Sequence, residues 1–278
     1  MTTRAGSSND LPPDLGEVLK QLDQYGYTVL HKNNIEVRTY DYVVNGDNVE
    51  AITFRPLSRG RSPGLFLIPG FAVTARDYVP HGVRFALEGF SCLAVSQRGF
   101  GRSGGKPDYV GPKTIDALIQ GYMQFKNEFY VDMDRMGIYG YSRGAMAAAL
   151  LAVKIASIKA TVLAAGIYDF QKAYDETKPV IREAMMRETG MTNEAIRQRS
   201  SLFLMKDLFC PVLILHGAKD ENVPVNQAYA LQQELTRLSK EFEIQTFPDR
   251  AHDIGTENRY TYPTDFLQRK LFPQPVLS

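Results

Sequence analysis

Residues 140–144 read Gly-Tyr-Ser-Arg-Gly, which places a serine between two glycines. This pentapeptide follows the short apolar run 136–139 and precedes an Ala-rich segment, a context that predicts a sharp turn from a strand into a helix. Gly140 and Gly144 would let the strand and the helix pack closely, and the helix N-terminus would favour a developing oxyanion. The pattern predicts Ser142 as a catalytic nucleophile, the alternative being a loop serine that caps the helix.

A serine hydroxyl is a weak nucleophile at neutral pH and needs a general base, and the chain has four histidines to supply one. His31 precedes the first expected hairpin, His81 lies in an expected helix, and His216 ends a buried strand, where a structural role is expected. His252 follows the last expected strand, in a loop of the kind where parallel sheets gather their sites. We therefore predict His252 as the base, the alternative being a solvated loop histidine.

The base in turn needs a carboxylate that fixes its tautomer and stabilises the imidazolium. Asp220 directly follows the strand expected at 212–215, and the order Ser, Asp, His then follows successive strands. Asp169, after the preceding strand, is the serious rival. Asp253 adjoins the histidine and is expected to point away from it.

The oxyanion of a tetrahedral intermediate needs two N–H donors. The first is expected from the backbone of Arg143, the residue after the serine. The second is expected from the turn after the strand at 65–68, where Pro69-Gly70-Phe71 allows close backbone approach, so Phe71 is the candidate.

These residues must be positioned by a sheet. Residues 35–44 and 49–54 are β-rich runs separated by Asn45-Gly46-Asp47, which predicts an antiparallel hairpin. After Pro63, short apolar runs alternate with helical patterns, which predicts an α/β fold with a mostly parallel sheet and helices on both faces. The strands are expected at 65–68, 91–95, 135–139, 161–165, 212–215 and 243–247, and the helices near 76–88, 114–130, 143–156, 225–239 and 263–271.

The chain is expected to comprise a tail and helix at 1–34, with a loose segment at 1–13 and a helix at about 14–24, followed by one α/β domain at 35–278. Residues 170–209, here called the insertion, are too long for a simple crossover. Two amphipathic stretches within it, 179–188 and 192–204, predict a small helical lid over the sheet.

The composition of the chain argues against nucleic-acid binding, membrane insertion and a cysteine metal site. Lys and Arg total 32 against 31 Asp and Glu, a net charge of +1 that gives no electrostatic footprint for nucleic acid or an anionic membrane. The chain shows neither a secretory signal nor a run of about 18 apolar residues that could span a membrane, so a cytoplasmic protein is expected. Cys92 and Cys210 lie in apolar runs, which favours buried free thiols over a disulfide or a metal site.

An ordered set of motifs resembles the α/β-hydrolase superfamily, and within it the branch that contains the prolyl oligopeptidases and the dienelactone hydrolase-like proteins. The motifs are PGF at 69–71, QRGFGRSGG at 97–105, GYSRG at 140–144, HGAKDENVP at 216–224 and DRAH at 249–252, and the resemblance covers roughly residues 35–270. It implies a hydrolase that uses Ser142, His252 and Asp220, with oxyanion donors at Phe71 and Arg143 and without a metal or organic cofactor.

The chain also departs from that pattern. Many esterases carry His-Gly or His-Gly-Gly at the oxyanion turn, whereas this chain has Pro69-Gly70, which argues against bulky tertiary-alcohol esters. Residues 1–34 are too few for the propeller of prolyl oligopeptidases, so peptide selection by such a filter is not expected. The leading hypothesis is hydrolysis of a small carboxylic ester or thioester through an acyl-enzyme on Ser142. The alternatives are a small-peptide or acyl-aminoacyl peptidase, an acyltransferase, and a non-catalytic ligand-binding protein; the oligomeric state is left open.

Overall fold

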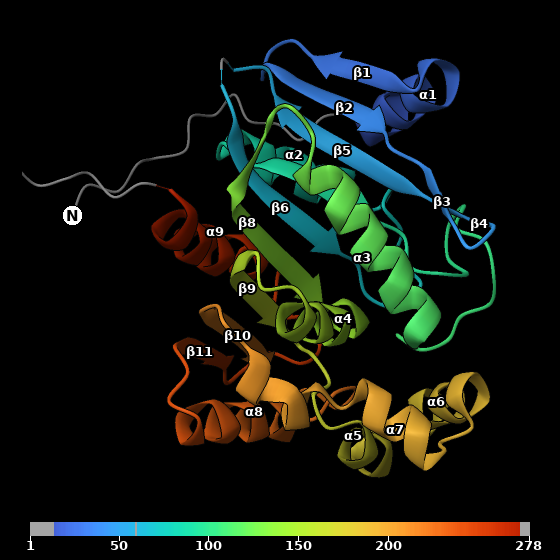
Figure 1. Cartoon of the computed structure of the whole chain (residues 1–278), viewed down its shortest axis with the longest axis vertical. Coiled ribbons are helices and arrows are strands. Elements are labelled where there is room, and N and C mark those ends of the chain that lie inside the picture. The colour runs from blue at the N-terminus through green and yellow to red at the C-terminus, as the bar shows by residue number, and fades with distance from the viewer. Residues whose placement is uncertain (1–13, 59, 273–278) are drawn as a thin grey trace, which may run out of the picture.

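The computed structural model describes residues 14–58 and 60–272, and a nine-stranded sheet runs through its centre (Figure 1). The strands lie in the order β1-β2-β5-β7-β6-β8-β9-β10-β11. From β1 to β7 each pair is antiparallel, and from β7 to β11 each pair is parallel. The strands are β1 (Tyr27–Leu30), β2 (Ile35–Thr39), β5 (Ala51–Pro56), β6 (Ser62–Ile68), β7 (Ser91–Val95), β8 (Val131–Tyr141), β9 (Ile158–Ala164), β10 (Val212–Gly217) and β11 (Phe242–Phe247).

The mostly parallel sheet with antiparallel N-terminal strands is therefore confirmed, and each of the six apolar runs after Pro63 forms a strand. The Asn45-Gly46 turn joins β3 (Tyr42–Val44) to β4 (Asp47–Val49), and both turn residues have a positive φ, as a tight hairpin requires. Strand β1 was not predicted. It lies within the range assigned to the tail and helix, yet it pairs with β2 in the main sheet.

Helices cover both faces of this sheet because each presents an apolar stripe to it. One face packs against α1, α2 and α9, and the other against α3, α4 and α8. In Figure 1, α3 and α4 lie in front of the sheet while α2 and α9 lie behind it. Their bounds are α1 (Leu15–Tyr25), α2 (Val79–Leu87), α3 (Pro112–Lys126), α4 (Arg143–Lys154), α8 (Asn226–Arg237) and α9 (Asn258–Leu271).

The insertion contains α5 (Phe170–Glu176), α6 (Pro179–Thr189), α7 (Asn193–Arg199) and the 3-10 helix η1 (Ser201–Asp207), and α5, α6 and α7 lie together at the bottom of Figure 1. Helix α5 was not predicted, although Asp169 caps it by accepting a hydrogen bond from the Lys172 N–H. The stretch 192–204 is not one helix as expected, because the chain turns at Ser200, between α7 and η1.

The structure also bears on the cysteines, on membrane-spanning helices and on the N-terminal residues. Cys92 and Cys210 are buried free thiols, as expected. Within residues 14–58 and 60–272, no helix combines the length and the apolar character needed to cross a membrane. The loose segment expected at 1–13 lies outside the described residues.

Candidate active site

Ser142 lies at the turn between β8 and α4 with φ 55° and ψ −121°, a backbone conformation that costs energy for a residue other than glycine. The two flanking glycines make this turn sterically possible. A Cβ at position 140 would lie 2.2 Å from the Gly144 carbonyl oxygen, and a Cβ at position 144 would lie 1.9 Å from the Ile68 carbonyl oxygen. The predicted strand-to-helix turn is thus present, and it needs glycine at both positions.

The structure brings Ser142, His252 and Asp220 together in one hydrogen-bonded chain. His252 Nε2 lies 2.9 Å from Ser142 Oγ, and His252 Nδ1 lies 2.7 Å from Asp220 Oδ2. Asp220 cannot donate when ionised, so Nδ1 carries the proton and Nε2 is left to accept the serine proton. This arrangement is the one required of a nucleophile, its base and the group that orients the base.

The Asp220 side chain is fully buried, whereas 23% of the His252 side chain is exposed. Asp220 Oδ1 accepts hydrogen bonds from the Asn222 and Val223 N–H groups, both at 2.9 Å. Burial by itself would raise the pKa of Asp220, but hydrogen bonds from His216 and His252 outweigh it and hold the pKa below its ordinary value. Asp220 is therefore ionised at neutral pH.

His216 is a site residue that sequence reasoning assigned only a structural role. Its Nε2 lies 2.8 Å from the Val223 carbonyl oxygen, which can only accept, so this nitrogen carries a proton. The same Nε2 lies 3.3 Å from Asp220 Oδ2 on the buried side of the carboxylate. The spacing His216 to Asp220 across the end of β10 was the only signal in the sequence for this contact.

The rival candidates lie elsewhere. Asp169 caps α5, and Asp253 is exposed and accepts a hydrogen bond from the Gly255 N–H at 3.0 Å. His31 is exposed, and the His81 ring stacks on Tyr260 with ring centroids 5.2 Å apart. Among the described residues, none of these four side chains forms a hydrogen bond or ion pair with Ser142 or His252.

The expected oxyanion turn approaches the serine closely. A Cβ at Gly70 would lie 3.3 Å from Ser142 Cβ, so the turn at 69–71 runs directly beside Ser142. Phe71 and Arg143, the predicted donors, both line the cavity that opens at Ser142. Arg143 is the first residue of α4, and the first N–H groups of a helix have no partner within that helix. Phe71 and Arg143 thus lie at the same cavity as Ser142, and their role as oxyanion donors stays a prediction.

The Arg143 side chain joins this turn to the insertion. Its guanidinium forms a forked, buried ion pair with Glu188 of α6, with N–O distances of 3.0 and 3.3 Å. The same guanidinium stacks over the Tyr109 ring at 3.9 Å and the Phe71 ring at 4.5 Å from their centroids. Glu188 also accepts a hydrogen bond from the Tyr109 N–H. Sequence reasoning missed Tyr109 and Glu188, because their contacts join segments far apart in the chain.

A cavity of about 510 Å³ opens at Ser142 and His252. Helix α6 forms one of its walls and adds two charged residues, Glu183 and Arg187. Within residues 14–58 and 60–272, no three His, Cys, Asp or Glu side chains are grouped so that they could hold a metal ion. The apolar part of the cavity lining comes from Phe71, Val73, Ile167, Val180, Ile181, Ala184 and Val223.

Comparison with known families gives one match across most of the chain: residues 85–272 match the model of the prolyl oligopeptidase family. The chain belongs to this family. It is a hydrolase of this group of serine enzymes, and the resemblance predicted from the ordered motifs is confirmed.

Relatives and solved structures agree with this placement. The uncharacterized peptidase YtmA of Bacillus subtilis is 26% identical over 226 residues, which cover 79% of this chain and 87% of the relative. Acylaminoacyl peptidase of Pyrococcus horikoshii has a TM-score of 0.77 at 21% identity and covers 86% of this chain, which spans only 42% of that protein. Acetyl xylan esterase 1 of a Thermoanaerobacterium species has a TM-score of 0.72 at 19% identity over 96% of both chains. These likenesses show the α/β-hydrolase fold.

Proposed function

We propose that this member of the prolyl oligopeptidase family hydrolyses a carboxylic ester or thioester of a small molecule through an acyl-enzyme on Ser142. The observation that carries the proposal is the chain of contacts from Asp220 Oδ2 through His252 to Ser142 Oγ, at 2.7 and 2.9 Å. A structural serine would need no such base, and a base without a buried carboxylate would not be held in the required tautomer.

In the first half-reaction, Ser142 Oγ attacks the ester carbonyl carbon while His252 Nε2 takes its proton. The carbonyl oxygen becomes an oxyanion that accepts hydrogen bonds from the backbone N–H groups of Phe71 and Arg143. The bond to the leaving group then breaks as His252 returns the proton to the departing alcohol or thiol. Asp220 stays ionised throughout and stabilises the imidazolium.

In the second half-reaction, water replaces the leaving group. His252 removes a proton from the water, which attacks the acyl carbon, and collapse of the second tetrahedral intermediate frees the acid and restores Ser142. The apolar lining of the cavity beside Ser142 would hold an apolar acyl or alcohol group of the substrate.

Ester hydrolysis is placed before peptide hydrolysis for two reasons. The acetyl xylan esterase matches this chain over 96% of its own length, whereas the acylaminoacyl peptidase is matched over 42% of its length. The cavity also offers mainly apolar side chains, whereas binding a peptide backbone calls for a series of hydrogen-bonding groups. The relative named as a peptidase, YtmA, supports a small-peptide or acyl-aminoacyl substrate as the second candidate.

The test compares p-nitrophenyl esters from acetyl to octanoyl with p-nitroanilides of the same acyl groups and with acyl-aminoacyl p-nitroanilides. We expect ester turnover that rises with acyl length until the cavity is filled, no anilide turnover, and loss of ester turnover in Ser142→Ala. Anilide turnover that is lost in Ser142→Ala would replace the esterase with a peptidase. Faster product release on adding an alcohol or amine acceptor would indicate acyl transfer, and a folded protein inert toward every substrate would indicate a binding protein.

A further inference from the structure

The turn that carries Phe71 is strained. Ala72, the residue after Phe71, has φ 57°, the left-handed region that costs energy for a residue with a side chain. Phe71 itself is half exposed, so its side chain is not locked in the core. A strained and partly exposed turn keeps one conformation only where its surroundings hold it, and the direction of the Phe71 N–H depends on that conformation.

One end of this turn is held by a glutamine of the QRGFGRSGG motif. Gln97 follows β7, which pairs in parallel with β6, so it emerges beside the residue that follows β6. Only 3% of Gln97 is exposed, and its Nε2 donates a hydrogen bond of 2.7 Å to the Pro69 carbonyl oxygen. On the helix side, a Cβ at Gly144 would lie 2.6 Å from that same oxygen. The carbonyl of Pro69 therefore lies close to the start of α4 and accepts a hydrogen bond from the Gln97 amide.

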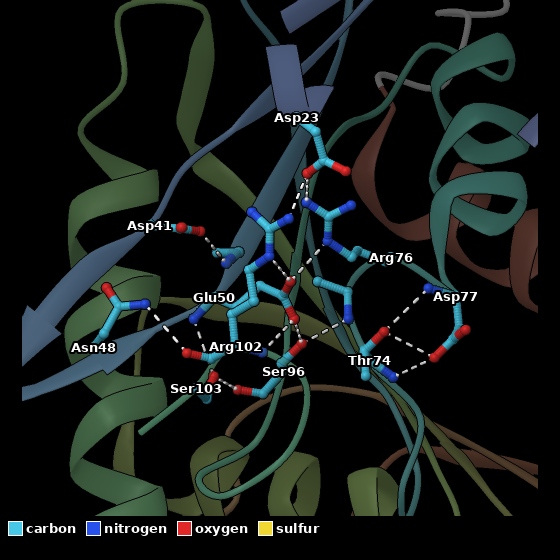
Figure 2. Close-up of polar contacts among 12 residues, drawn as sticks. Asp23, Asp41, Asn48, Glu50, Thr74, Arg76, Asp77, Ser96, Arg102 and Ser103 are labelled. Atoms are coloured by element: carbon cyan, nitrogen blue, oxygen red, sulfur yellow. Dashed lines mark hydrogen bonds and ion pairs between the residues drawn. The ribbon is translucent and has the colours of Figure 1, made fainter. Parts of the chain in front are cut away.

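The segment that follows the turn, up to Ala75, is held by Ser96, the residue before Gln97. Ser96 Oγ accepts a hydrogen bond of 2.7 Å from the Ala75 N–H and donates one of 2.6 Å to Glu50 Oε2. Figure 2 shows Glu50 at the centre of these contacts, with Arg76 on one side and Arg102 on the other. Glu50 is 2% exposed, so this end of the turn rests on a buried carboxylate that is itself paired with the Arg76 guanidinium.

The middle of the turn is held by the same motif. The Phe100 ring packs edge-on against the Phe71 ring, with centroids 5.4 Å apart. Residues 96–100 thus contact the turn at its beginning through Gln97, at Phe71 through Phe100, and at its end through Ser96.

We propose that Gln97 is a positioning residue for the oxyanion hole: its amide fixes the Pro69 carbonyl and thereby aims the Phe71 N–H at the developing oxyanion. The inference rests on the proposed function, because the oxyanion forms only if Ser142 attacks a carbonyl. Gln97 is not among the residues that line the cavity at Ser142, so its loss would act through the direction of the donor. It should affect the transition state more than the binding of the ground state.

The test replaces Gln97 by Met, which is similar in length and cannot donate. The readouts are kcat and KM for a p-nitrophenyl ester, and the Ki of a trifluoromethyl ketone with the same acyl chain, whose adduct with Ser142 carries an oxyanion. We expect kcat to fall about 10-fold, less than the 100-fold or more typical of removing a donor outright, with KM changed less than about twofold. The Ki of the ketone should rise by the same factor by which kcat/KM falls. Gln268→Met, the same change at a side chain that donates a hydrogen bond to Glu88 far from the turn, should match the wild type.

A kcat equal to that of the wild type in folded Gln97→Met would overturn the inference. So would a fall in kcat without weaker inhibition by the ketone, because the loss would then lie outside the oxyanion hole. Thermal unfolding checks that the variant is folded, and if it is not, Gln97→Asn, whose side chain is one methylene shorter, is judged by the same two criteria. Ser142→Ala is assayed alongside: activity retained there contradicts the proposed function itself, whereas activity lost there and unchanged in Gln97→Met contradicts only the role of Gln97.

Discussion

The hydroxyl of Tyr141, the residue before Ser142, donates a hydrogen bond of 2.5 Å to the backbone carbonyl of His252. Burial raises the pKa of Tyr141 to about 12, so the hydroxyl keeps its proton at neutral pH. The Arg259 guanidinium also lies over the Tyr141 ring, 4.7 Å from its centroid. The loop that carries His252 is thus fastened to the strand that leads into Ser142.

Tyr141→Phe keeps the ring and removes this tether. Because His252 lies on a loop, we expect its ring to lose part of its alignment with Ser142 and kcat to fall about 10-fold, with KM little changed. Tyr25→Phe removes a hydroxyl from a ring that is 63% exposed and should leave kcat unchanged. Equal kcat values for Tyr141→Phe and the wild type would show that the loop holds His252 without Tyr141.

Asp220→Asn should lower kcat by roughly 10⁴-fold, because an amide at this position favours the wrong tautomer of His252. The chain offers matched controls in the two rival carboxylates. Asp253→Asn changes an exposed side chain, and Asp169→Asn keeps a good helix cap, so both should stay within about twofold of the wild type. Steady-state kinetics on one ester compares the three variants. A larger loss of kcat in Asp169→Asn than in Asp220→Asn would identify Asp169 as the carboxylate that acts on His252.

The buried pair of Arg143 and Glu188 should matter for stability. Glu188→Ala leaves the Arg143 guanidinium buried without its partner, so we expect it to lower the free energy of unfolding by about 3 kcal/mol. Adding Arg143→Met to this change should recover much of the loss. Glu183→Ala, which removes an exposed carboxylate from the same helix, should change the free energy of unfolding by less than about 0.5 kcal/mol. Urea denaturation measures all four proteins, and a neutral Glu188→Ala would show that the pair adds nothing.

His81 should make stability depend on pH. Burial, together with the positive charges of Arg259 and Arg84, lowers the pKa of His81 to about 4, whereas the unfolded chain has an ordinary value near 6.5. Between these values the unfolded state binds a proton that the folded state does not. The contribution of His81 is therefore complete above pH 6.5 and is lost as the pH falls toward 4, by up to about 3 kcal/mol.

Urea denaturation at pH 7.5, 5.5 and 4.5 tests this for the wild type and for His81→Gln, which cannot titrate. The free energy of unfolding should fall more steeply with decreasing pH in the wild type than in the variant. Parallel curves for the two proteins would contradict the expected change in proton binding at His81.

The fold and the core of the site could be predicted from local patterns. The strands of the parallel sheet are short apolar runs, and Ser142, Asp220 and His252 each follow one of them at the carboxyl end. Strand β1 escaped prediction because a run of four residues gains its stability from pairing with β2, which a local pattern does not report. The role of Gln97 escaped for the same reason: its bond to Pro69 spans 28 residues and exists only because β6 and β7 are neighbours.

The contacts of the insertion could not be predicted from the sequence either. The pairing of Glu188 with Arg143 joins residues 45 positions apart, and nothing near either residue in the sequence specifies it. Periodicity identified the segment that becomes α6, but not the face that α6 turns toward the nucleophile. The contacts that join the insertion to the turn at Ser142 are therefore seen only in the three-dimensional structure.

Labelling by a fluorophosphonate is the direct test of whether Ser142 is an activated nucleophile, as proposed. We expect the folded wild type to be labelled on Ser142 within minutes, as shown by mass spectrometry of the modified peptide. Ser142→Ala should not be labelled, and Asp220→Asn should be labelled much more slowly. A folded wild type that resists the probe, or equal labelling of Ser142→Ala, would contradict the account.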